Sequence, residues 1–216
     1  GDILNIDVTV IVDGWYGDTS RMYVAGKLSR KAERLIQITH DSLMLGIEAV
    51  KPGNTFGDIG HAIQSFVESH RMSVVRDFCG HGLGRVFHAP PNVVHYGKPG
   101  TGPKLEPGMF FTIEPMVNLG RPETKTLADE WTAVTRDKSL SAQFEHSIGV
   151  TDDGFEIFMK REDLIHPIIS GNKFRKLKYN IEKFKKNKNS TLITFGGAYS
   201  NHLLAVSYIA KIENIN

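Results

Sequence analysis

Alternating apolar and polar residues mark two extended segments at the start of the chain. From Ile3 to Val12, apolar side chains recur at every second position, which is typical of a half-buried β-strand. Asp13-Gly14 follows, a pair that favours a two-residue hairpin turn, and Trp15–Val24 predicts the returning strand. We therefore expect a β-hairpin whose apolar face joins the core and whose polar face carries Asp7.

A change to helical spacing follows this hairpin. Apolar residues over Ala32–Val50 recur at intervals of three and four, and Ser29 is a suitable N-cap. The Pro-Gly pair at 52–53 ends the first helix. A second helix is predicted to open at Asn54 or Thr55 and to run to about residue 69.

The remaining pattern predicts short strands around one long loop. Residues 79–102 are rich in glycine, proline and histidine, and a long ordered loop in a compact domain usually has a function. Towards the C-terminus we expect helices over Asn172–Lys186 and Asn201–Ile212, separated by a strand at Thr191–Thr194. Other strands are expected at Ser73–Asp77, Met109–Val117, Trp131–Thr135, Ala142–Thr151 and Glu156–Lys160.

Charge is distributed unevenly along the chain. The net charge is +2, but residues 1–158 carry 15 basic and 20 acidic residues, whereas residues 159–216 carry 11 and 4. Such a shift indicates two segments of different origin. The lysines concentrate at Lys176–Lys188, which favours the solvated face of a helix over a nucleic-acid site, because no aromatic residues interleave with them.

Composition narrows the class of protein. A chain of 216 residues that is 40% hydrophobic is not disordered throughout, and it has no apolar run near the ~20 residues of a membrane span. Cys79 is the single cysteine, which excludes an intrachain disulfide and fits a reducing, cytoplasmic setting. The chain begins at Gly1 without a signal sequence, so we expect a fragment or a processed piece.

Acidic residues on the predicted hairpin point to a cation site. If Asp13-Gly14 forms the turn, Asp7 and Asp18 lie on one face as diagonal neighbours, roughly 7–8 Å apart at the backbone. Two acids in this arrangement repel each other unless a positive group lies between them. Each alone has an ordinary alternative explanation, as an exposed strand residue or a turn acid.

Three more residues extend this pattern. His81 lies between glycines that permit close backbone approach, and Glu114 and Glu145 interrupt apolar strands. Alone, His81 could be a buried histidine and the two glutamates could face water. Together with Asp7 and Asp18 they provide four carboxylates and one imidazole, which match two divalent cations such as Mn, Fe, Co or Zn.

Six segments carry a specific motif pattern: Asn5–Thr9, Gly17–Ser20, Cys79–Gly84, Phe87-His88, Thr112–Met116 and Ser139–His146. On these segments, residues 1–158 resemble the C-terminal two-thirds of the type I methionine aminopeptidases, which are bacterial metallopeptidases with the pita-bread fold. The short interval between His81 and Glu114 resembles type I, since type II enzymes carry an insertion there.

This resemblance implies an α+β fold, an incomplete pita-bread domain, and a metal-dependent hydrolysis that removes N-terminal Met from nascent proteins. It implies the N-terminal Met of nascent peptides, encountered at the ribosome, as the binding partner. Composition and charge pattern predict a cytoplasmic protein with no nucleic-acid or membrane partner. His88 would contact the substrate, and Glu114 would also accept a proton. The N-terminal third of the family's domain is absent from this sequence, so the sheet is expected to expose a long edge and an apolar face. The implied ligands of two metal ions are Asp7, Asp18, His81, Glu114 and Glu145.

Three segments of the basic C-terminal part carry a second motif pattern: Lys160–Leu164, Ser170–Leu177 and Thr194–His202. On these segments, residues 159–216 resemble the N-terminal part of two pyridoxal-phosphate enzymes, 1-aminocyclopropane-1-carboxylate deaminase and D-cysteine desulfhydrase. The resemblance implies a short α/β fragment of a fold-type II enzyme. Pyridoxal phosphate is implied as a cofactor only for the complete parent enzyme, since this segment lacks the family's phosphate loop and the partner of the pyridine nitrogen. Lys173 would be the Schiff-base lysine, Asn201 would contact the cofactor ring, and Ser200 would assist near the substrate.

The sequence therefore predicts two domains, 1–158 and 159–216, and leaves alternatives to a metallopeptidase. One alternative is a pyridoxal-phosphate-dependent deaminase or lyase as the operative enzyme. Another is a binding module with the pita-bread fold and no catalysis, although such a module has no need of four converging carboxylates. A third is a chimeric, non-catalytic polypeptide that joins fragments of two enzymes near residues 156–161. Cys79 is expected to be structural rather than a nucleophile.

Overall fold

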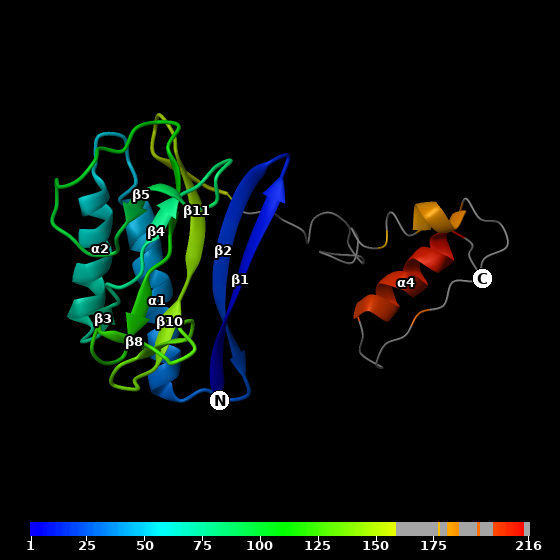
Figure 1. Cartoon of the computed structure of the whole chain (residues 1–216), viewed down its shortest axis with the longest axis horizontal. Coiled ribbons are helices and arrows are strands. Elements are labelled where there is room, and N and C mark those ends of the chain that lie inside the picture. Colours follow the sequence, from blue (N-terminus) through cyan, green and yellow to red (C-terminus); the bar gives the residue numbers. More distant parts are fainter. Residues whose placement is uncertain (159–176, 178–180, 186–193, 195–200, 214–216) are drawn as a thin grey trace. The chain divides into compact units, whose positions relative to one another are not determined.

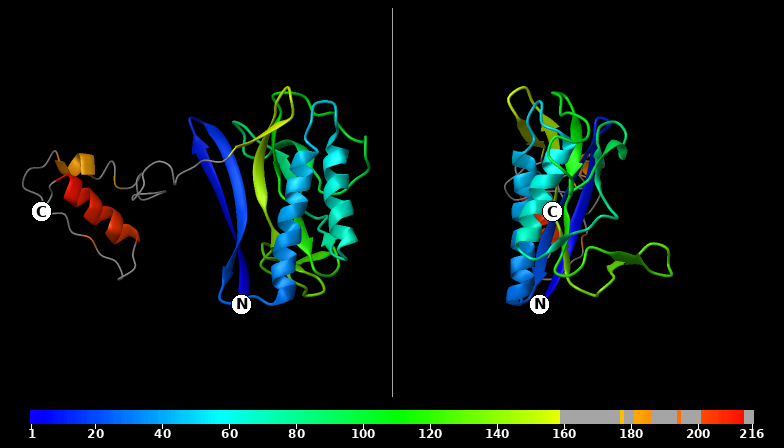
Figure 2. Two further views of the ribbon diagram at one scale, coloured as in Figure 1. Left: turned by 180° about the vertical axis from the view of Figure 1, so that it is seen from behind. Right: turned by 90° about the vertical axis from the view of Figure 1, so that its left-hand side faces the viewer.

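The computed structural model describes residues 1–158, 177, 181–185, 194 and 201–213. The chain divides into two compact units, Gly1–Met159 and Lys160–Asn216. The first unit contains a sheet with helices on one face (Figures 1 and 2). No helix among the described residues is long and apolar enough to cross a membrane.

The predicted hairpin is confirmed in its register. Strands β1 (Asp2–Val12) and β2 (Trp15–Ala25) pair antiparallel from Val12 opposite Trp15 to Asp2 opposite Ala25. The turn residues Asp13 and Gly14 have φ angles of 52° and 81°. Both lie in the left-handed region that a two-residue turn of this type requires, which is why an Asp-Gly pair occupies it.

Both predicted helices begin at side-chain caps. Helix α1 (Arg30–Glu48) starts after Ser29, whose hydroxyl accepts a hydrogen bond from the Ala32 amide at 3.2 Å. Helix α2 (Phe56–Ser69) starts after Thr55, which forms a reciprocal capping box with Asp58.

The two helices pack closely and cover one face of the sheet (Figure 2). Gly46 permits this contact, since a Cβ at its position would lie 2.6 Å from Cδ1 of Ile63 on α2. The core lies between the helices and the sheet. Its fully buried members include Leu35, Ile47, Ile63, Phe111, Ile113 and Ile148.

The central sheet has seven antiparallel strands in the order β1-β2-β11-β6-β4-β5, with β12 also paired to β11. The strands that join the hairpin in this sheet are β4 (Gly80–Gly82), β5 (Ala89–Val93), β6 (Phe110–Ile113), β11 (Glu145–Val150) and β12 (Phe155–Phe158). A second sheet contains β10 (Ser141–Gln143), β7 (Met116–Asn118) and β3 (Ser73–Val74). A two-stranded ribbon contains β8 (Thr124–Thr126) and β9 (Ala133–Thr135).

Two strands predicted as continuous are interrupted. The segment Met109–Val117 splits into β6 and β7, which belong to different sheets, because Pro115 has no N–H for the ladder. The segment Ala142–Thr151 splits at Phe144 into β10 and β11. The predicted long loop at 79–102 is also corrected, since it contains β4 and β5.

The outer apolar face of the hairpin is exposed. Ile6, Val8 and Val12 are 44–47% exposed, so the prediction that this face joins the core is wrong. Among the described residues, β1 pairs only with β2. This agrees with the expectation that the sheet presents a long edge and an apolar face.

The second unit contains helix α4 (Asn201–Ile212), with the predicted bounds. Residues 177 and 181–185 are also helical and lie within the helix predicted over 172–186. Lys185 forms an ion pair with Glu213. The predicted strand at 191–194 lies outside the described residues apart from Thr194, which is not in a strand. A small apolar cluster comprises Leu177, Ile181, Ala205, Val206 and Ile209.

Candidate metal centre

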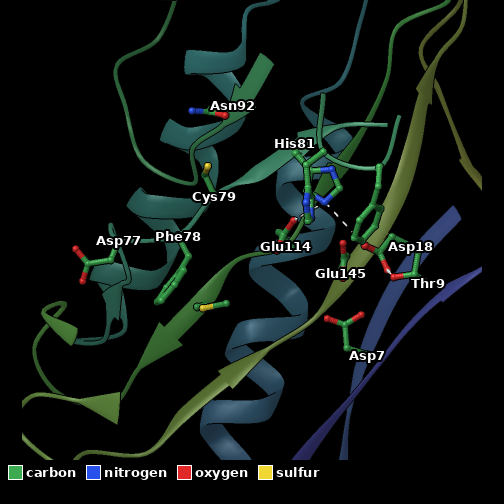
Figure 3. Close-up of a pocket in the computed structure, with 13 residues that line it drawn as sticks. Asp7, Thr9, Asp18, Asp77, Phe78, Cys79, His81, Asn92, Glu114 and Glu145 are labelled. Atoms are coloured by element: carbon green, nitrogen blue, oxygen red, sulfur yellow. Dashed lines mark hydrogen bonds and ion pairs between the residues drawn. The ribbon is translucent and has the colours of Figure 1, made fainter. Parts of the chain in front are cut away.

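All five residues predicted as metal ligands line one cavity of about 700 Å³ (Figure 3). They come from adjacent positions in the central sheet: Asp7 on β1, Asp18 on β2, Glu145 on β11, Glu114 directly after β6, and His81 on β4. The antiparallel order of the strands therefore brings together side chains that are distant in sequence.

Strand register explains why the acids meet. Ser20 on β2 is paired with Asp7 on one side and with Glu145 on the other. Directly paired residues project to the same face of a sheet, and so do residues two apart on a strand. Asp18, which is paired with Thr9, therefore joins Asp7 and Glu145 on one face. This agrees with the predicted placement of Asp7 and Asp18.

Asp18, His81 and Glu145 form a group that could hold a metal ion, with one donor atom from each lying within 4.8 Å of the others. The His81 Nε2 atom lies 3.9 Å from Oδ2 of Asp18 and 3.7 Å from Oε1 of Glu114. Asp7 also lines the cavity and is exposed to solvent. The geometry therefore contains a compact set of three donors with two more carboxylates beside it.

His81 is oriented by its own strand. Its Nδ1 atom lies 3.0 Å from the Gly82 carbonyl, which can only accept a hydrogen bond. This contact favours the tautomer protonated at Nδ1, so that the lone pair of Nε2 faces the carboxylates. A neutral imidazole held in this way is suited to bind a metal ion.

Burial makes the carboxylates costly to ionise together. Glu145 is 1% exposed, and its Oε1 atom has no hydrogen-bond partner among the described residues. Burial, followed by the charges of Glu114 and Asp18, raises the pKa of Glu145 to about 10. Burial is also the main cause that raises the pKa of Glu114 to about 7 and the pKa of Asp7 above its usual value.

This chemistry fits divalent cations. None of the described residues that line the cavity is a lysine or an arginine. Four converging carboxylates and an imidazole are a donor set that Mn, Fe, Co and Zn accept. The unpartnered oxygen of Glu145 is one that an ion in this cavity would satisfy.

Three supporting residues were not singled out from the sequence. Thr9 donates to Oδ1 of Asp18 at 2.9 Å, and Gln143 donates to Oε2 of Glu114 at 3.2 Å. Thr112 donates to Oε1 of Glu114 at 2.7 Å, and its hydroxyl accepts from the His81 amide at 3.0 Å. Thr9, Thr112 and Gln143 each lie two positions from one of the acids, so the strand period of two could have identified them.

His88 lies at the rim of the same cavity and is exposed. Its ring is perpendicular to that of His81, with centroids 4.5 Å apart, and tilted against Phe87 at 4.0 Å. This position allows His88 to meet a molecule bound beside His81. Other lining residues that the sequence did not single out are Asp77, Phe78, Asn92 and Met116.

Cys79 also lines the cavity. Burial, followed by the charge of Glu114, raises the pKa of its thiol. A raised pKa leaves little thiolate, which agrees with the expectation that Cys79 is not a nucleophile.

The residues predicted to bind pyridoxal phosphate are only partly described. Lys173 and Ser200 lie outside the described residues. Asn201 is described only as the first residue of α4. These assignments remain predictions from the sequence.

Comparison with known proteins identifies relatives of the first unit. Methionine aminopeptidase of Rickettsia prowazekii is 64% identical over 159 residues, which are 73% of this chain and 61% of that protein. Methionine aminopeptidase of Escherichia coli (strain K12) is 56% identical over 171 residues, which are 79% of this chain and 65% of that protein. This chain therefore spans less than two thirds of the length of these relatives.

Solved structures lead to the same family. The crystal structure of the Rickettsia prowazekii enzyme superposes with a TM-score of 0.72 and covers 73% of this chain and 64% of its own. Methionine aminopeptidase from Thermotoga maritima is 43% identical, has a TM-score of 0.71, and covers 73% of this chain and 63% of its own. These neighbours confirm the pita-bread fold of the first unit. The profile described as metallopeptidase family M24 matches residues 1–152, and the chain therefore belongs to metallopeptidase family M24.

Proposed function

We propose that this chain is a metal-dependent methionine aminopeptidase that removes N-terminal Met from newly made proteins. The observation that carries the proposal is the convergence of four carboxylates and His81 in one cavity. High identity to methionine aminopeptidases supports the substrate class. We further propose that the protein acts in the cytoplasm and meets its substrates at the ribosome.

The proposed ligands of two divalent metal ions are Asp7, Asp18, His81, Glu114 and Glu145. When bound at these residues, divalent metal would supply a water activated near neutral pH and positive charge that favours hydrolysis. Glu114 accepts a proton at a carboxylate oxygen, and Thr112 and Gln143 hold that carboxylate in place. His88 at the rim contacts the peptide and stabilises charge that develops on its carbonyl oxygen.

A thermal melt of the full chain with and without Mn²⁺ or Co²⁺ tests the metal centre. A ligand that binds only the folded state at a hundredfold excess over its dissociation constant adds about 2.7 kcal/mol of stability. We expect this stabilisation in the wild type and its loss in Asp18→Asn. Asp13→Asn is the matched control, because it makes the same change at the exposed turn of the same hairpin.

Release of methionine from a short peptide that begins Met-Ala tests the reaction. We expect metal-dependent release that Asp18→Asn abolishes and Asp13→Asn retains. A metal-insensitive melt together with no release would overturn the proposal. A metal-dependent melt without release would reject the peptidase activity and keep the metal centre, as a binding module would.

We infer a separate domain for the C-terminal segment, with a domain division at residues 158–159. The change in charge near residue 159 and the division into two compact units support this inference. The resemblance to pyridoxal-phosphate enzymes rests on the sequence motifs alone. A visible absorption band on addition of pyridoxal phosphate, lost in Lys173→Ala, would show that this segment binds the cofactor by itself. The absence of a band would restrict the cofactor to the complete parent enzyme.

A further inference from the structure

A histidine outside the predicted ligand set contacts the backbone of the cluster. His95 follows β5 and is 2% exposed. Its Nε2 atom accepts a hydrogen bond from the Glu114 amide at 3.0 Å. Since Nε2 acts as an acceptor, the ring carries its proton on Nδ1.

Glu114 needs this acceptor because of its position between two sheets. Strand β6 of the central sheet ends at Ile113, and β7 of the second sheet begins at Met116. Glu114 is not part of either ladder, and Pro115 follows it. A backbone N–H that is shielded from water and has no partner is destabilising, so the hydrogen bond to His95 stabilises this change of direction.

The segment that carries His95 is itself held against α2. A Cβ at Gly60 would lie 2.4 Å from the carbonyl oxygen of Tyr96 and 2.9 Å from that of Val94. The backbone on both sides of His95 therefore packs directly on the helix. Because a helix is a rigid support, it positions the ring more accurately than a free loop would.

We propose that His95 is a positioning residue for the metal centre, and that its ring fixes the Glu114 backbone so that the Glu114 carboxylate faces His81. Thr112 and Gln143 hold the carboxylate oxygens, and His95 holds the main chain that carries them. This inference rests on the proposed function, since it assumes that Glu114 binds metal.

The test measures the dissociation constant of Mn²⁺ for the full chain by isothermal titration calorimetry. His95→Phe keeps a planar ring and removes the acceptor, and we expect metal binding to weaken about 10–100-fold, as is typical for residues that support metal ligands. His95→Gln retains an acceptor oxygen and should bind within a few-fold of the wild type. In a Glu114→Ala background, His95→Phe should have no further effect, because it acts through Glu114.

A purely structural role for His95 predicts a different result. Val67→Ala, a fully buried change on α2, should lower the melting temperature and leave metal affinity unchanged. If His95→Phe behaves like Val67→Ala, the inference fails and the proposed function stands. If the wild type itself binds no Mn²⁺, both fail.

A measurement on the wild type keeps the inference testable if His95→Phe does not fold. Nitrogen-15 NMR of the histidine rings should show an unprotonated Nε2 on His95. It should also show a change in the His95 signals on titration with Zn²⁺. A protonated Nε2, or signals that Zn²⁺ leaves unchanged, would overturn the inference.

Discussion

Replacing the buried Glu145 with glutamine should change the stability of the protein in opposite directions with and without metal. Glu145 is almost fully buried, and its pKa is raised from 4.5 to about 10. In chelator at pH 7, the folded chain must therefore bind a proton that the unfolded chain has released. The amide in Glu145→Gln is neutral at every pH and avoids this cost.

The size of this stability difference follows from the interval between pH 7 and the pKa of 4.5 that Glu145 has in the unfolded chain. At 1.36 kcal/mol for each pH unit, the wild type loses about 3 kcal/mol of stability at pH 7 that Glu145→Gln retains. The sign is that of a raised carboxyl pKa: the cost is absent below pH 4.5 and grows as the pH rises towards the folded value. With excess Mn²⁺ the wild type should be more stable than Glu145→Gln, because the variant lacks one proposed metal ligand.

Urea unfolding followed by circular dichroism, in EDTA at pH 5, 6, 7 and 8, measures this difference. The gap between Glu145→Gln and the wild type should widen with each pH unit. Glu106→Gln, at an exposed position, is the control and should show no such gap. Parallel pH profiles for the wild type and Glu145→Gln would refute the reasoning.

Other predictions address the supports around the site and the second unit. Thr55→Ala should lower stability by about 1 kcal/mol through loss of the α2 cap. Hydrogen bonds from the Thr55 amide and hydroxyl lower the pKa of Asp58, and Thr55→Ala removes the hydroxyl bond. The stability that Asp58 contributes is present above its unfolded pKa of 3.8 and is lost as the pH falls below that value. Urea unfolding at pH 7 and pH 3 should therefore show a smaller difference between Thr55→Ala and the wild type in acid. Thr112→Val should weaken Mn²⁺ binding about 10–100-fold in calorimetry, whereas Thr112→Ser keeps the hydroxyl and should bind like the wild type. Equal Mn²⁺ affinities of Thr112→Val and Thr112→Ser would contradict the role of the hydroxyl. Val206→Asp places a charge in the apolar cluster of the second unit and should expose α4 to hydrogen exchange while metal binding is retained. Loss of metal binding in that variant would show that the two units depend on each other.

Local sequence patterns determined much of the first unit. An Asp-Gly turn, a strand period of two and capping residues act over a few neighbours, so the hairpin register and both helix starts were predictable. That register also placed Asp7 and Asp18 on one face before any tertiary contact was considered. Of the three other proposed ligands, Glu114 and Glu145 were identified as charged residues within apolar strands, and His81 as a histidine between glycines. The family resemblance supported all three.

Tertiary structure alone decided the features that depend on contacts between distant segments. The strand expected over Met109–Val117 divides between two sheets because Pro115 interrupts pairing and Glu114 finds an acceptor in His95, 19 residues earlier. No local pattern encodes that contact. The exposure of the hairpin's apolar face and the burial of Glu145 likewise depend on which elements pack on the sheet. Alternation in a sequence shows that a strand has two different faces, but only packing determines which face meets the core and which meets water.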